Sequence, residues 1–285
     1  MLQEESKIKA LISLLDDEDT EVTVHVKREI MSIGESIIPF LEDEWGKNFN
    51  PLVQKRIEDI IHQLHFFNLK EKLRQWKDGG AIDIIEGMWL LACYQYPDLE
   101  LQKVKIALDQ IYYEVWPDMK EDLSPTDQIK LLNNAIFNKL KFGANTKNFH
   151  SPSNSMINSV LESKKGNPIS LCVIYMHIAQ RLKLPVYGVN LPNLFILTYK
   201  IEGAQFYINV FNKGLVFTRE DIDNYITQLN IAKNDIFYEP CNNVDIVTRV
   251  LRNLVVSFEK LGDTERVEEI NQLLEGIVGR DQRSI

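Results

Sequence analysis

One helix in the second half of the chain constrains the fold more than any other segment. It begins at Asn167-Pro168, where the asparagine caps the helix and the proline fits its first turn. From there to Leu182 the segment is apolar nearly all round, so we expect it to be buried. When the first turn of such a helix points at a cleft, a cysteine placed in that turn is most strongly activated as a nucleophile. Free N–H groups there stabilise a thiolate and an oxyanion.

The segments around this helix predict a mostly helical α+β fold. β-branched and aromatic residues predict three strands, at 186–191, 194–199 and 205–210. Pro192-Asn193 separates the first two strands, and the second gap, about five residues around Gly203, predicts a hairpin turn. We expect a small antiparallel sheet. Helical periodicity predicts helices at 81–96, 99–115, 126–140 and 242–261, and a last helix capped by Asp263.

The first 75 residues show a twofold helical repeat. An apolar stripe that starts at Val22 recurs 31 residues later, starting at Val53. The polar breaks before the stripes supply helix caps, Asp19 or Thr20 in the first and Asn50 with Pro51 in the second. This pattern resembles a pair of short HEAT-like helical hairpins. The alternative is a plain helical extension of the main domain.

We therefore expect three segments: a helical extension at 1–78, a core at 79–218, and a helical segment at 219–285 that packs on the core. The first boundary follows from the flexible pair Gly79-Gly80 after a charged helix. The second boundary is where the strands end and helical periodicity returns.

Composition excludes several classes of protein. The 285 residues carry a net charge of −9, without a basic cluster, which disfavours a nucleic-acid partner. No apolar run reaches the roughly 18 residues that span a bilayer, and the acidic Met1–Ser6 segment does not resemble a signal peptide. Cys93, Cys172 and Cys241 are odd in number and far apart, so we expect free thiols and a cytoplasmic location.

Residues from about 81 to 275 closely resemble the SirB-type branch of bacterial transglutaminase-like proteins. The similarity depends on the order and spacing of short motifs, among them Asn154-Ser155, Gly166-Asn167-Pro168-Ile169-Ser170-Leu171, Pro192-Asn193-Leu194-Phe195 and Asn209-Val210-Phe211-Asn212-Lys213-Gly214. The resemblance implies a papain-like core in which a helix start and two strands carry Cys, His and Asp.

The resemblance also implies that this triad has been lost. The nucleophile position falls between Pro168 and Ser170, Leu194 stands where the family has its His, and Asn209 replaces the Asp. A leucine cannot accept a proton, and acyl transfer collapses when triad members are missing. The residues expected to line the relic cleft are Asn154, Asn167, Ser170, Asn193, Leu194 and Asn209.

These observations favour a non-catalytic protein that binds a protein or peptide through the relic cleft or through its helical surfaces. The alternative is a cysteine hydrolase or acyltransferase that uses Cys172 with a base from outside the family pattern. A third possibility is a regulatory module that acts through the N-terminal hairpins alone.

Other candidate groups point to structural roles. Cys172 lies past the first helical turn, as a core residue would, and Ser170 fits a capping or pocket-lining role. His177 is about 10 Å along the helix from Ser170, too far for a hydrogen bond. His62 and His65 have the i, i+3 spacing of a metal pair but lack a third ligand nearby. We expect neither a metal nor a cofactor.

Overall fold

The computed structural model describes residues 2–17, 19–120 and 122–279. Two compact units divide the chain between Lys72 and Leu73, inside helix α4. Met1 and residues 280–285, the ends of the first and last predicted segments, lie outside the described residues. The predicted boundary at 218/219 stays a prediction.

The first unit is made of helices, which form where the stripes and caps predict them. Their bounds are Leu2–Ser13 (α1), Thr20–Ile33 (α2), Ile38–Lys47 (α3) and Pro51–Asp78 (α4, which continues into the second unit). The Asp19 carboxylate accepts from the Glu21 N–H at the start of α2. The Asn50 side chain accepts from the Leu52 N–H at the start of α4. Both predicted caps are confirmed.

The apolar stripes of the first unit meet in one core. Val26 and Ile30 of α2 pack with Val53 and Ile57 of α4 and with residues of α1 and α3. The repeat seen in the sequence therefore corresponds to two helical pairs that bury a common face.

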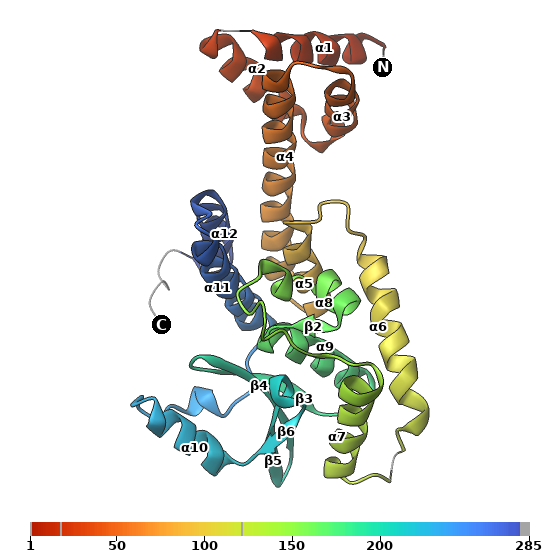
Figure 1. The fold of residues 1–285 in the computed structure, drawn as a ribbon, viewed down its shortest axis with the longest axis vertical. Coiled ribbons are helices and arrows are strands. Elements are labelled where there is room, and N and C mark those ends of the chain that lie inside the picture. Colours follow the sequence, from red (N-terminus) through yellow and green to blue (C-terminus); the bar gives the residue numbers. More distant parts are fainter. Residues whose placement is uncertain (1, 18, 121, 280–285) are drawn as a thin grey trace. The chain divides into compact units, whose positions relative to one another are not determined.

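The second unit is α+β, as predicted (Figure 1). Its helices are Ile84–Cys93 (α5), Leu101–Val115 (α6), Pro125–Asn133 (α7), Ile157–Ser163 (α8), Pro168–Arg181 (α9), Arg219–Gln228 (α10), Asn243–Leu261 (α11) and Thr264–Val278 (α12). The predicted helix at 126–140 changes to π-helical geometry over Asn134–Lys139. There the Leu140 N–H bonds to the carbonyl of Ala135, five residues back.

The sheet is antiparallel, in the order β3-β4-β5-β6. Its strands are Val186–Leu191 (β3), Leu194–Ile201 (β4), Ala204–Asn209 (β5) and Leu215–Phe217 (β6). Two-residue turns join the first three, with positive φ at Asn193 and Gly203. Gly143–Ala144 (β1) and Lys165–Gly166 (β2) form a short parallel pair, and β2 leads directly into α9. The sequence did not predict β1, β2 or β6, which have two or three residues each.

Alternation along the strands gives the sheet two buried sides. Val189, Ile196 and Tyr207 pack with Ile222 and Ile226 of α10. The alternate residues, such as Leu197 and Ile208, are also fully buried and point to the opposite side. Helix α9 contacts β3 and β4 as well as α5, α6, α8 and α11, so the apolar helix predicted from the sequence is central.

Candidate functional site

The start of α9 is held by a buried network of polar side chains. The Asn167 Oδ1 accepts from the Ser170 N–H at 2.9 Å, which is the predicted cap. The Asn167 Nδ2 donates to the Ser155 Oγ at 2.8 Å. Both amide ends of Asn167 are thereby used, which fixes the first turn of α9 against the 3₁₀ turn Pro152–Ser155.

The Ser170 hydroxyl belongs to the same network. It donates to the Asn154 carbonyl at 2.7 Å, and Ser170 is 1% exposed. A Cβ at Gly166 would come within 2.6 Å of the Ser170 Oγ, so the glycine before the helix makes room for this hydroxyl. Ser170 therefore stabilises the start of α9, and in the described part of the chain its hydroxyl donates to backbone carbonyls, not to a base that could activate it as a nucleophile.

Hydrogen bonds from the Asn154 side chain hold the preceding loop in place. Its Nδ2 donates to the carbonyls of Asn148 and Phe149 at 2.7 and 3.0 Å. Its Oδ1 accepts from the Asn145 Nδ2 at 2.8 Å. Asn154 is 2% exposed, so this predicted cleft residue is buried and shapes the loop from within.

The fastened loop presents an aromatic cluster at the surface. Phe149 is 45% exposed and makes edge contacts with the His150 ring and with Phe211 on the 3₁₀ turn after β5. The ring centroids of Phe149 and Phe211 are 6.1 Å apart, within the range of an aromatic pair. We name Phe149, His150 and Phe211 the aromatic cluster. The sequence did not predict this contact.

The two strand positions expected for a base and its partner lie on one side of the sheet. The register pairs Leu197 with Ile208, which makes Leu194 and Asn209 diagonal neighbours on adjacent strands. Leu194 packs against the apolar cluster that Ile196 and Tyr207 form with residues of α10. The Asn209 Oδ1 accepts from the Asn212 N–H at 3.1 Å, which caps the 3₁₀ turn. Asn193 is exposed in the turn before β4, with a φ of 58°.

Cys172 lies deeper than these residues and is fully buried. Its thiol donates to the Phe195 carbonyl, with the sulfur 3.7 Å from the oxygen. Burial raises the pKa of Cys172, and a backbone hydrogen bond with Val210 offsets only part of that rise. Among the described residues, no histidine is recorded as a partner of this thiol. A thiol that remains protonated at neutral pH is a poor nucleophile.

Burial shifts the pKa values of two further candidate groups, Cys241 and His177. Cys241 is mostly buried, and burial raises its pKa to about 12. His177 lies farther along α9, where burial and the nearby Arg181 lower its pKa to about 4. Within the described ranges, no group of three or more His, Cys, Asp or Glu residues could hold a metal ion, so His62 and His65 gain no third ligand. No described helix is long and apolar enough to cross a membrane.

A last contact ties the strands to the helices. The carbonyl of Gly214, just before β6, accepts from the Asn133 Nδ2 at 3.0 Å. The Asn133 Oδ1 accepts from the Tyr175 hydroxyl of α9 at 2.8 Å. Gly214 has a φ of 75°, and a Cβ there would lie 2.0 Å from the Asn133 side chain. The glycine that ends the last family-like motif is thus required by both its backbone angle and its space.

Comparison with known proteins agrees with this architecture. The model of the transglutaminase-like superfamily matches residues 102–252, which include the α9 helix and the sheet. The chain is 28% identical over 192 residues to a UPF0162 protein of Xylella fastidiosa, covering 62% of this chain and 65% of that protein. It therefore spans just under two thirds of that relative.

Two further relatives match shorter stretches. The F-box only protein 21 of Homo sapiens is 30% identical over 151 residues, covering 50% of this chain and 23% of that protein. A UPF0162 protein of Pasteurella multocida is 32% identical over 92 residues, covering 32% of this chain and 35% of that protein. No solved structure matches the chain significantly.

Proposed function

The chain belongs to the transglutaminase-like superfamily, and we propose that it is a non-catalytic member that binds a protein or peptide. One observation carries the proposal. The positions that match the family's acid–base pair hold Leu194, which packs beneath α10, and Asn209, which caps a turn. The thiol of Cys172 is buried and its pKa is raised, which supports a protein without an activated nucleophile at this position.

The hydrogen-bond network at the start of α9 supports a binding role. Asn154, Asn167 and Ser170 use buried hydrogen bonds to hold a loop in one conformation. That loop places Phe149 at the surface against Phe211. Exposed aromatic side chains on a rigid support are typical anchors of protein interfaces, because they bury a large area at a small cost in conformational entropy.

We propose the finer features of the resemblance together with this function. The motifs around α9 and β4 support membership of the SirB-type branch, and the paired helices of the first unit support HEAT-like hairpins. Cys172 and Cys241 are free thiols, which supports a reducing, cytoplasmic location. The net charge of −9 supports a protein partner over a nucleic acid.

A photo-crosslinking experiment tests the binding role. A benzophenone amino acid replaces Phe149 in one variant and Trp116, an aromatic residue that is 56% exposed on a different element, in the control. We expect a defined adduct from position 149 in cells and none of that mass from position 116. We also expect the adduct to disappear when Phe211→Asp removes the aromatic neighbour.

The opposite result points to another surface. If position 149 gives no adduct, and a partner captured by the whole chain is lost when residues 1–72 are deleted, binding depends on the N-terminal hairpins and the aromatic cluster is not the site.

A further inference from the structure

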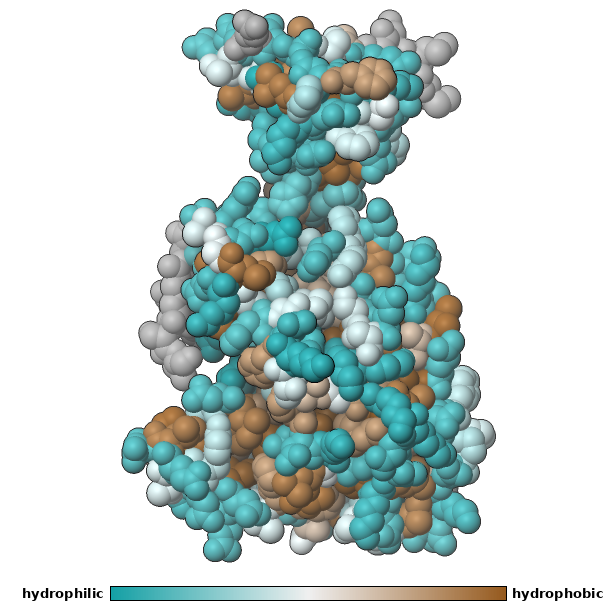
Figure 2. All heavy atoms as spheres, viewed as in Figure 1, coloured by the Kyte–Doolittle hydropathy of each residue, from teal (hydrophilic) through white to brown (hydrophobic). Residues whose placement is uncertain are grey.

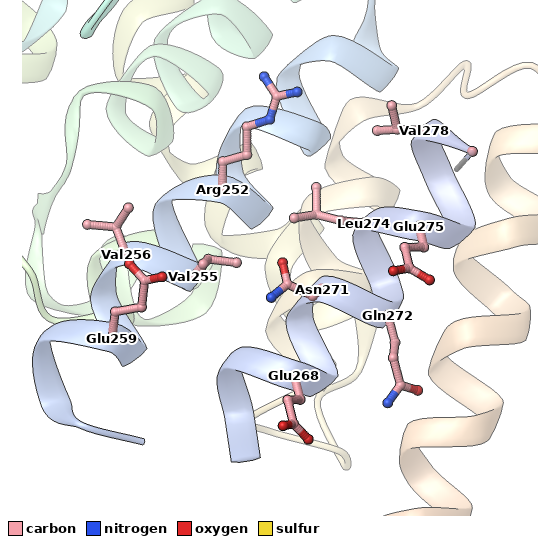
Figure 3. A pocket seen from close by; sticks show the side chains of 11 residues that line it. Arg252, Val255, Val256, Glu259, Glu268, Asn271, Gln272, Leu274, Glu275 and Val278 are labelled. Atoms are coloured by element: carbon pink, nitrogen blue, oxygen red, sulfur yellow. The ribbon is translucent and has the colours of Figure 1, made fainter. Parts of the chain in front are cut away.

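A pocket lies between the last two helices, away from the residues discussed so far. It has a volume of about 760 Å³ and is lined by residues of α11 and α12. Figure 3 shows side chains from both helices along it. We name this pocket the α11–α12 groove.

Part of the groove is lined by apolar side chains that lie outside the core of the protein. Leu254 and Phe258 of α11 are fully buried in the core. Val255 and Val256 face the groove, and Val256 is 43% exposed. Leu274 of α12 also lines the groove. We name Val255, Val256 and Leu274 the apolar strip of the groove, which lies beside the core face of α11.

The charged residues along the groove are mostly acidic. Glu259, Glu268 and Glu275 line it, against the single guanidinium of Arg252. Glu259 and Glu268 are exposed. The whole chain carries a net charge of −9, so local and long-range electrostatics both favour a basic ligand.

We infer that the α11–α12 groove binds a basic amphipathic helix of a partner protein. A groove between two helices accepts a third helix, whose apolar residues at i, i+3 and i+4 enter the groove while its lysines or arginines meet the acidic rim. This inference goes beyond the proposed function, because it assigns a second binding surface, separate from the aromatic cluster, and the class of partner that this surface binds.

A defined peptide probe tests the inference. It is a fluorescein-labelled peptide of leucine and lysine, about 18 residues or five helical turns long, with leucines at helical spacing. A second peptide has the same composition in an order that breaks this spacing, and a third has glutamate in place of lysine. Binding to the full chain is measured by fluorescence anisotropy at about 0.15 M salt.

Two double variants with equal net charge separate the groove from general acidity. E259K/E268K reverses charge on the groove, whereas E162K/E220K reverses two exposed acids on α8 and α10. We expect E259K/E268K to weaken binding of the helical peptide about tenfold and E162K/E220K to leave it within about twofold. Val256→Asp should also weaken it, because the apolar strip is interrupted.

The inference would be overturned if both double variants weakened binding of the helical peptide equally, or if the peptide with broken spacing bound as tightly as the helical one. General attraction to an acidic protein explains either result. That failure is distinct from a failure of the proposed function, which the crosslink at position 149 and the reactivity of Cys172 report independently.

Discussion

His177 provides a pH-dependent test of how deeply α9 is packed. Burial and, after it, the charge of Arg181 lower its pKa from an ordinary value of 6.5 to about 4. Asp83 and Asp109 each raise this pKa by less than Arg181 lowers it, and Lys105 lowers it by less than either aspartate raises it. The folded protein therefore resists protonation of this side chain at pH values where the unfolded chain accepts a proton.

The sign and size of the effect follow from this difference. Above about pH 6.5 His177 is neutral in both states and contributes nothing to the pH dependence. Between pH 6.5 and 4 the unfolded chain binds the proton first, so the free energy of unfolding falls as pH falls. The pKa difference corresponds to a loss of about 3 kcal/mol by pH 4, at 1.36 kcal/mol per unit.

Urea unfolding between pH 7.5 and 4.5, followed by circular dichroism, measures this slope. His177→Gln should flatten the fall below pH 6.5 relative to the wild type, whatever its stability at pH 7.5. His25→Gln, at an exposed position on α2, should keep the wild-type slope. The contribution of the carboxylates to the pH dependence is the same in every variant, so it cancels when the slopes are compared. A slope in His177→Gln equal to that of the wild type would refute the reasoning.

The contacts at the site give three further predictions. In urea titrations, Gly214→Ala should lower the free energy of unfolding by about 1–3 kcal/mol more than Gly203→Ala does. Both glycines have positive φ, but only Gly214 faces the Asn133 side chain. Equal losses of stability in the two variants would contradict this account. Asn167→Ala should cost about 1–2 kcal/mol in the same assay, because the α9 cap is lost, and an unchanged midpoint would count against the cap. Leu194→His should hydrolyse an activated ester no faster than Cys172→Ala does, because the Cys172 thiol remains buried. If Leu194→His shows turnover that the double variant Leu194→His/Cys172→Ala lacks, one substitution has rebuilt the site.

The sequence predicted the elements that are long and periodic. The apolar helix from Asn167, the strands from Val186 to Asn209 and the final helical hairpin all form where predicted, because burial reinforces their periodicity. Helix caps such as Asp19 and Asn50 also form as predicted, since they depend on neighbours a few residues away.

The features that the sequence did not predict depend on distant contacts. The π-helical stretch after Asn133 and the strands β1, β2 and β6 are too short to leave a periodic signal. The contact between Phe149 and Phe211 joins residues 62 positions apart, and only the folded chain brings them together. The packing of Leu194 beneath α10 is likewise tertiary, so the sequence did not predict it.

Alkylation of Cys172 tests the proposed non-catalytic role most directly. The folded chain is treated with iodoacetamide near pH 7.5, and modification of each cysteine is followed over time by peptide mass spectrometry, with urea-unfolded chain as the reference. We predict that Cys172 reacts at least about a hundredfold more slowly in the folded chain, because its thiol is buried, protonated and bonded to the Phe195 carbonyl. Rapid modification of Cys172 in the folded chain, matching or exceeding the unfolded rate, would contradict a non-catalytic core.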